Sequence, residues 1–195
     1  MAHAISPSAG VSAVHPTGDA RGLARGRIVH KLLQALPAVA PERRAEAARK
    51  PFARTEDFSE IERDAIIGEV LTLLDEARFA PLFAAGSRAE VPIVGYVSHG
   101  GSRHKVSGQV DRLAVTESTV LIADYKSDRA VPQRREDIPP GHIGQLALYR
   151  AVLRLLYPNH EVRAALVWTL GPVLIEVPAA LLDAELSRLQ SSKNT

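Results

Sequence analysis

The sequence predicts a mixed α/β domain in which helices flank a central mixed sheet of about five strands. Apolar residues recur at helical spacing through much of the chain between residues 23 and 74. Three strand-like segments follow between residues 90 and 125, where β-branched side chains are frequent. A long helical segment then precedes two further strands and a closing helix. This order of elements is typical of a sheet that is covered by helices.

Helices are expected over residues 23–36, 41–48, 58–74, 143–157 and 181–189. Pro37 ends the first of them, because proline cannot continue the backbone hydrogen bonding of a helix. The third helix has an apolar stripe that is expected to face the core, formed by Ile61, Ala65, Ile66, Val70, Leu73 and Leu74. The fourth carries leucines as far as Leu155 and Leu156.

Strands are expected over residues 90–97, 105–116, 120–125, 162–170 and 173–177. The first three are close together in the chain and are expected to form a meander, with a polar turn at 116–119 between the second and the third. Gly171 and Pro172 form the turn between the last two strands. Residues 1–21 are rich in Ala, Ser, Pro and Gly without a period, and are interpreted as a flexible leader or linker remnant. The domain is therefore expected to span residues 22–195.

The composition restricts the chemistry that the chain can perform. With 195 residues and 46% hydrophobic content, the chain can bury the core of one ordinary domain. It has no cysteine, which excludes disulfides, thiolate zinc sites and iron–sulfur clusters. Neither a signal peptide nor an apolar segment of about 20 residues is present, so a cytoplasmic protein without a membrane partner is expected. The net charge is only +2, so an argument for nucleic-acid binding depends on local sites.

Three charged residues occupy strand positions at which apolar residues are expected. Asp111 interrupts one strand, while Asp124 and Lys126 stand at the end of the next. One residue separates Asp124 from Lys126, so both project from the same face, and pairing across the turn places Asp111 on that face as well. Carboxylate oxygens are ligands that Mg²⁺ and Mn²⁺ prefer, and a metal would offset the cost of burying these charges. The alternative is a buried Asp–Lys ion pair, with Asp111 capping a turn.

Two helices present polar pairs one turn apart. His30 and Gln34 form a polar notch in the apolar face of the first helix, and Gln145 and Tyr149 share a face of the fourth. Each pair taken alone is more typical of ordinary helix-surface residues than of a site. Phosphate-binding glycine loops and a serine nucleophile elbow are absent from the sequence.

Taken together, these residues resemble the motifs of the PD-(D/E)XK nuclease superfamily, and within it the RecB-like nuclease domain. The matching motifs are Gly26-x-x-x-His30, Gly108-x-x-Asp111, Asp124-Tyr125-Lys126 and Gln145-x-x-x-Tyr149. They occur in the family's order on helix, strand, strand and helix. Further segments are similar to the C-terminal nuclease domains of the AddA helicase–nuclease subunits of bacterial AddAB complexes, over roughly residues 22–185. These are residues 30–37, 89–93, 108–113 and 166–169.

The resemblance implies a restriction-endonuclease-like core and metal-dependent hydrolysis of DNA. It implies that His30, Asp111, Asp124 and the backbone carbonyl of Tyr125 bind Mg²⁺ or Mn²⁺. Lys126 would orient the attacking water, so that Asp111, Asp124 and Lys126 form the catalytic set. Gln145 and Tyr149 would line the DNA path, and Glu90 corresponds to an acidic strand residue of many relatives.

The AddA proteins carry this domain behind a helicase motor, which the present sequence does not contain. The resemblance therefore implies a possible AddB-type subunit and a separate helicase part as partners, besides DNA. Two alternatives stay open at this point. One is a non-catalytic DNA-contact or docking remnant of a helicase–nuclease, and the other is a phosphohydrolase that acts on a small substrate.

Overall fold

The computed structural model describes residues 4–5, 20–99, 102–127 and 130–191, which form a mixed α/β fold. The helices are α1 (Ala20–Ala35), α2 (Pro41–Ala48), α3 (Glu60–Asp75), α4 (Pro140–Leu156) and α5 (Ala179–Ser191). The strands are β1 (Ala4–Ile5), β2 (Arg88–His99), β3 (Ser102–Val115), β4 (Thr119–Lys126), β5 (Glu161–Trp168) and β6 (Val173–Val177). Short 3-10 helices are η1 (Leu36–Ala38), η2 (Lys50–Arg54), η3 (Ala77–Phe83) and η4 (Arg135–Asp137).

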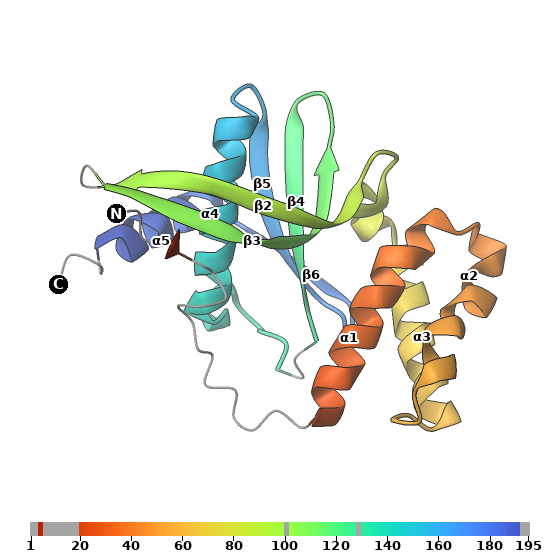
Figure 1. Ribbon diagram of the computed structural model, residues 1–195. Helices are drawn as coiled ribbons and strands as arrows, with labels where there is room; N and C mark the ends of the chain where they lie inside the picture. Colours follow the sequence, from red (N-terminus) through yellow and green to blue (C-terminus); the bar gives the residue numbers. More distant parts are fainter. Residues whose placement is uncertain (1–3, 6–19, 100–101, 128–129, 192–195) are drawn as a thin grey trace.

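The strands form one mixed sheet in which β3 has neighbours on both edges (Figure 1). Along one edge, β2 pairs with β3 in antiparallel fashion over nearly its whole length. On the other edge, β4 pairs antiparallel with the C-terminal end of β3, and the two residues of β1 pair parallel with Lys105 and Val106. The sheet continues through a parallel β4–β5 pair to an antiparallel β5–β6 pair.

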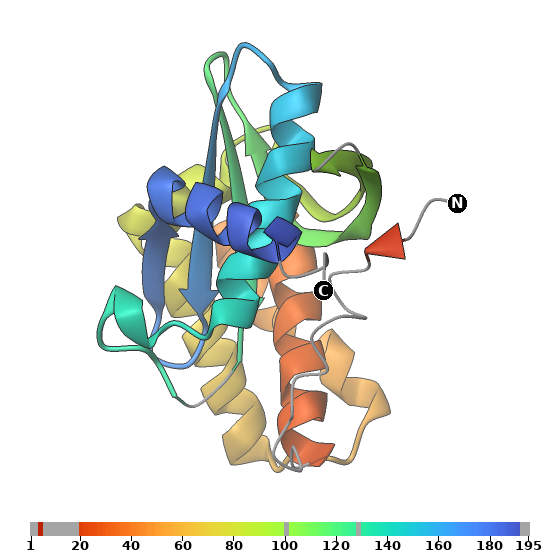
Figure 2. The same ribbon diagram turned by 90° about the vertical axis from the view of Figure 1, so that its left-hand side faces the viewer.

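Helices cover both faces of the sheet and create two cores. Helices α4 and α5 lie on one face, while α1 and α3 lie on the other (Figure 2). The α4-side core contains Val110, Ile122 and Leu146, and the α1-side core contains Leu33 and Phe79. The apolar run of β4 supplies both cores, because its successive side chains point to opposite faces. The C-terminal end of β4 is therefore held between two packed layers of helices. This packing fixes the positions of the last residues of the strand.

The five predicted strands and five predicted helices are confirmed, with ends that shift by a few residues. The polar turn after β3 closes with a 2.9 Å hydrogen bond from Thr116 N to Thr119 O. Helix α3 begins one residue after Ser59, which forms a capping box with Glu62. Of the expected leader, Ala4–Ile5 form β1 in the sheet and Ala20 begins α1, while residues 1–3 and 6–19 lie outside the described residues.

The predicted apolar stripe of α3 is wrong at its first two positions, because Ala65 is exposed as well as Ile61. Ile61 is 83% exposed, and the buried positions are Ile66, Ile67, Val70 and Leu73. The first turn of α3 carries its side chains away from the α1-side core, so only the later turns bury apolar groups. Leu155 and Leu156 are likewise exposed at the end of α4. Among the helices of the described ranges, none has the length and apolar character that crossing a membrane requires.

Candidate active site

The sheet opens between β3 and β4 at the two predicted aspartates. The ladder between these strands ends at the pair Arg112 and Ala123, so Asp111 and Asp124 are not paired through their backbones. In place of a ladder bond, the backbone N–H of Tyr125 donates to Asp111 Oδ2 at 2.6 Å. This bond fixes the Asp111 carboxylate beside the end of β4. At this level β3 and β4 are therefore joined through the Asp111 side chain rather than by the ladder.

The same level of the sheet contains a break in side-chain alternation. Side chains three positions apart on a regular strand point to opposite faces, yet Val110 and Leu113 both pack in the α4-side core. The alternation of side chains along β3 is therefore interrupted between these two residues. On the adjacent β2, Glu90 has a φ of 54°, a left-handed conformation that is uncommon for residues other than glycine. Glu90 and Asp111 would be opposite each other, yet neither is paired in the β2–β3 ladder. The distortion frees both carboxylates from the regular pleat.

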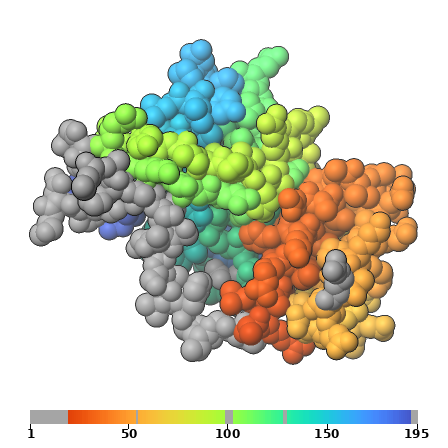
Figure 3. Space-filling model, in the orientation of Figure 1, coloured from red at the N-terminus to blue at the C-terminus, as the bar shows by residue number. Residues whose placement is uncertain are grey.

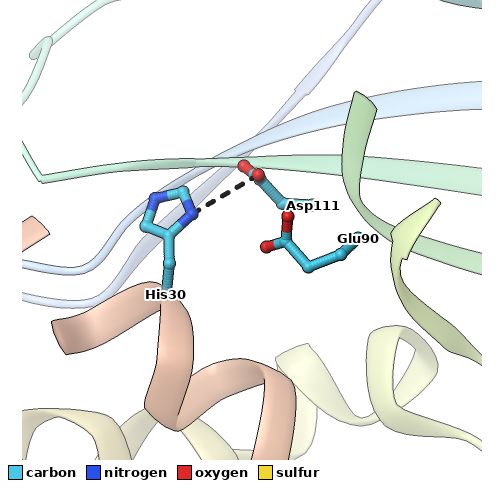
Figure 4. Close-up of side chains that lie close together, drawn as sticks. All are labelled: His30, Glu90 and Asp111. Carbon is cyan, nitrogen blue, oxygen red and sulfur yellow. Dashed lines mark ion pairs between the residues drawn. The ribbon is translucent and has the colours of Figure 1, made fainter. Parts of the chain in front are cut away.

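Helix α1 brings His30 to this opening. At Gly26 the helix passes so close to the end of β4 that an added Cβ would lie 2.9 Å from Ser127 Oγ. One turn later, His30 Nδ1 lies 3.4 Å from Asp111 Oδ1 (Figure 4). The imidazole also meets the Tyr125 ring edge-on, with 5.7 Å between the ring centroids. The small residue at position 26 thus explains how a helix residue reaches a strand carboxylate.

His30, Glu90 and Asp111 form a compact group of potential ligands. One donor atom from each lies within 4.8 Å of the others, and all three side chains are partly exposed. Burial alone would lower the pKa of His30, but the Asp111 contact and the charges of Asp111, Glu90 and Asp124 outweigh it and raise that pKa. Burial and the Asp111 charge also raise the pKa of Glu90. The Glu90 carboxylate therefore carries an electrostatic cost that a bound cation would relieve.

Asp124 and Lys126 form a second, more buried pair beside this group. Lys126 Nζ lies 2.5 Å from Asp124 Oδ2, and their side chains are 13% and 6% exposed. Apart from this ion pair, Asp124 Oδ2 has no hydrogen-bond donor among the described residues. Burial raises the pKa of Asp124, and the Asp111 charge adds to the increase while the Lys126 ammonium opposes it. The Lys126 carbonyl accepts a 2.9 Å bond from Thr169 N, which anchors the end of β4.

Helix α4 supports the site from the opposite face of β3. Tyr149 is 2% exposed, and its hydroxyl accepts a 3.1 Å hydrogen bond from the backbone N–H of Gln109. The Gln109 amide in turn donates to Glu90 Oε2 at 2.7 Å and to the Glu90 carbonyl at 3.1 Å. A Cβ added at Gly108 would lie 2.1 Å from the Tyr149 hydroxyl, so only glycine admits this ring. The chain of contacts runs from α4 through β3 to the left-handed residue of β2.

The structure thus brings most of the predicted residues together, and their predicted roles as ligands stay predictions. Glu90 joins His30 and Asp111, while Asp124 faces Lys126. Gln145 is partly exposed and donates a 3.4 Å hydrogen bond to the Tyr149 hydroxyl. Gln34 is exposed one turn after His30 and has no described contact with the group. The Tyr125 side chain packs in the α1-side core.

Sequence reasoning missed Gln109, which holds Glu90. Its position in the motif Gly108-x-x-Asp111, pointing to the same face as Asp111, is the signal from which it could have been found. The predicted DNA contacts of Gln145 and Tyr149 stay predictions, and the structure adds that Tyr149 braces the strand that carries Asp111.

The residues present fit a divalent cation. Two carboxylates and an imidazole converge, with one donor atom of each within 4.8 Å of the others, and the buried Asp124 carboxylate beside them has its Oδ2 against the Lys126 ammonium. Carboxylate oxygens of this kind suit Mg²⁺ and Mn²⁺. His30, Glu90 and Asp111 would hold such an ion.

One comparison with known proteins shows the family of the chain. The sequence matches the family model described as PD-(D/E)XK nuclease superfamily over residues 5–190. No curated protein matches the chain. Among 25 matching chains of solved structures is one titled "Crystal structure of SSO0001", with 19% identity and a TM-score of 0.34 over 83% of this chain and 75% of that chain. Because the family match spans nearly the whole sequence, the chain belongs to the PD-(D/E)XK nuclease superfamily, whose nucleases use divalent metals.

Proposed function

We propose that the chain is a Mg²⁺- or Mn²⁺-dependent deoxyribonuclease of the exonuclease type. The observation that carries the proposal is the convergence of His30, Glu90 and Asp111 within 4.8 Å, beside the buried Asp124–Lys126 pair. Such a site combines potential metal ligands with a lysine ammonium that would act on a phosphate. A hydrolase of phosphodiester bonds needs both groups, because negative charge builds on the phosphate as water attacks.

Each residue has a role that follows from its contacts. When bound, the cation would supply charge stabilisation for the phosphate being hydrolysed. Asp111 is held by Tyr125 N and contacted by His30, so its oxygens keep a fixed orientation. Lys126, whose ammonium lies against Asp124, would orient the attacking water and stabilise the negative charge of the phosphate. In-line attack would leave a 5′-phosphate and a 3′-hydroxyl.

The cellular role proposed for the chain is that of an AddA-type nuclease in double-strand break repair and DNA recombination. The segments around His30, Glu90, Asp111 and Trp168 support it by their similarity to AddA nuclease domains. An AddB-type subunit and a separate helicase part are the proposed partners, and the cytoplasm is the proposed compartment. Residues 22–195 are proposed as the nuclease domain.

A cleavage assay on labelled DNA tests the activity. Linear single-stranded DNA, linear duplex and closed circles are incubated with Mg²⁺, with Mn²⁺ or with chelator. We expect the wild type to degrade linear DNA only with metal and to spare circles, and we expect Asp111→Asn to lose the activity. Cleavage of circles would replace the exonuclease assignment with an endonuclease. Binding of DNA without cleavage in either metal would favour the non-catalytic docking alternative.

Gln109→Ala is expected to weaken metal binding about 10-fold to 100-fold, because residues that orient a ligand typically have effects of that size. Without the amide of Gln109, the Glu90 carboxylate loses its 2.7 Å hydrogen-bond donor. Calorimetric titration of the protein with Mn²⁺ measures this change directly. Gln133→Ala, at an exposed loop position, is the matched control and should bind Mn²⁺ as the wild type does. Equal affinity in both variants would show that Gln109 does not support the site.

A further inference from the structure

The β2–β3 hairpin extends beyond the site, and the part of the chain that the structure describes leaves one of its faces exposed. Ile93, Val97 and Val106 point into the α4-side core, so the residues between them point to the opposite face. We call this face the outer strip, and it consists of Pro92, Val94 and Tyr96 of β2 with Arg103, Lys105, Ser107 and Gln109 of β3. In Figure 3 the hairpin crosses the molecule as a ridge above α1.

The outer strip begins at the candidate active site. Gln109 is its first member on β3, and the Gln109 amide contacts the Glu90 carboxylate at 2.7 Å. Cross-strand pairs then follow in register along the hairpin, with Val94 opposite Ser107 and Tyr96 opposite Lys105. From Glu90 to Tyr96 the strand rises about 20 Å, at roughly 3.3 Å per residue. A chain-like ligand that leaves the site along this face would therefore meet Tyr96.

The strip combines apolar, aromatic and cationic groups. Val94 is 59% exposed and Tyr96 is 39% exposed, so both side chains are accessible to a ligand. The Arg103 guanidinium lies over the Tyr96 ring, 4.5 Å from its centroid, and Lys105 is directly opposite the same ring. Residues 91–98 and 103–110 contain no Asp or Glu. Acidic side chains therefore occur only where the strip meets the candidate active site, and the basic side chains Arg103 and Lys105 lie further along the hairpin.

We propose that the outer strip binds single-stranded DNA whose scissile end occupies the candidate active site. Tyr96 and the Arg103 plane offer a platform for stacking bases, and Lys105 contacts the phosphates. The platform favours a single strand, because the faces of bases inside a duplex are already stacked. The proposal rests on the proposed nuclease function and adds to it the form of the substrate and the side on which it lies.

Two features of the outer strip favour DNA over a protein as its ligand: its positive charge and its direct connection to the candidate active site. A polyanion complements a face on which Arg103 and Lys105 are the only charged groups beyond Gln109 in residues 91–98 and 103–110. A protein partner would need no path toward His30, Glu90 and Asp111. Unchanged DNA affinity in variants of the strip would favour a protein ligand.

Fluorescence anisotropy of a labelled oligothymidylate of about 15 nucleotides, in chelator, tests the strip without cleavage. We expect Tyr96→Ala and Arg103→Ala each to weaken binding about 10-fold. Lys105→Ala should lower the slope of log affinity against log salt by about one. Binding of duplex of equal length should change little. Lys50→Ala in η2 and Ile61→Ala in α3 are exposed controls on other elements, and both should bind as the wild type does.

Wild-type affinity in the Tyr96 and Arg103 variants would overturn the proposal and leave a protein as the occupant. An equal loss on duplex and single strand would overturn it too, because it would indicate a general basic surface. Thermal unfolding of each variant checks that it folds. The two proposals separate cleanly, because DNA binding in chelator reports on the strip and cleavage in metal reports on the nuclease. A trinucleotide is too short to reach Tyr96, so its cleavage should be insensitive to the strip variants.

Discussion

Lys126→Met is expected to reduce DNA cleavage by about 10²-fold to 10⁴-fold, the usual effect of losing a group that transfers or orients a proton. The same change leaves the Asp124 carboxylate buried without its cation. Removing one partner of a buried ion pair costs about 3–5 kcal/mol in the free energy of unfolding, because the remaining charge is uncompensated. Both side chains are under 15% exposed, so solvent screening is weak. Urea unfolding and a cleavage assay measure the two losses.

A double variant separates these two consequences. Asp124→Asn combined with Lys126→Met removes both charges, so it should regain most of the lost stability while cleavage stays absent. Arg163→Ala is the matched control, because the Arg163–Glu176 pair lies on the surface, with both side chains about 40% exposed. It should cost at most about 1 kcal/mol and leave cleavage unchanged. If the double variant cleaves DNA, neither residue belongs to the catalytic set.

Gly108→Ala is expected to lower the free energy of unfolding by about 1–3 kcal/mol, as overpacking of a core does. The added Cβ would lie 2.1 Å from the Tyr149 hydroxyl and 2.8 Å from two ring carbons. The buried ring must shift, and the hydrogen bond from Gln109 N is then lost. Cleavage should fall as well, because Gln109 positions Glu90 and Asp111 lies three residues further along β3. Urea unfolding and the cleavage assay report the two effects.

A second substitution and a control make this prediction specific. Tyr149→Phe in the Gly108→Ala background removes the closest clashing atom and should restore part of the stability. Gly68→Ala is the control, since Gly68 is exposed in α3 and its Cβ would meet nothing within 4 Å. It should stabilise the protein by about 0.5–1 kcal/mol, because alanine favours a helix interior. Equal effects at Gly68 and Gly108 would contradict the proposed clash.

The order of helices and strands could be predicted because apolar periodicity and proline report on local structure. Helix α1 ends at Ala35, one residue before the expected end, and Pro37 lies in the 3-10 helix η1 that follows. The turn at 116–119 sets the β3–β4 register. That register is what brings Asp111 level with Asp124. Charged residues inside apolar strands are a strong signal, since nothing in the local pattern accounts for them. For this reason the sequence alone predicts Asp111, Asp124 and Lys126 as catalytic candidates.

The remaining features depend on contacts between distant parts of the chain. The place of Glu90 in the ligand group requires a left-handed backbone in β2, which no spacing rule encodes for a glutamate. The burial of Tyr149 depends on the absence of a side chain at Gly108, forty-one positions earlier. The exposure of Ile61 reflects where the core beneath α3 ends. Each of these features depends on contacts between two elements, so the pattern of one segment does not predict it.

The left-handed backbone of Glu90 has a consequence for how the sequence can vary. Glycine and asparagine adopt a φ of 54° at lower cost, so selection for folding alone would favour them at this position. A glutamate here has a conformational cost of about 1–3 kcal/mol, which is typical of backbone strain at functional sites. The residue therefore trades thermodynamic stability for a carboxylate next to Asp111. A library selected only for thermal resistance would be expected to discard this glutamate, and with it the carboxylate beside His30 and Asp111.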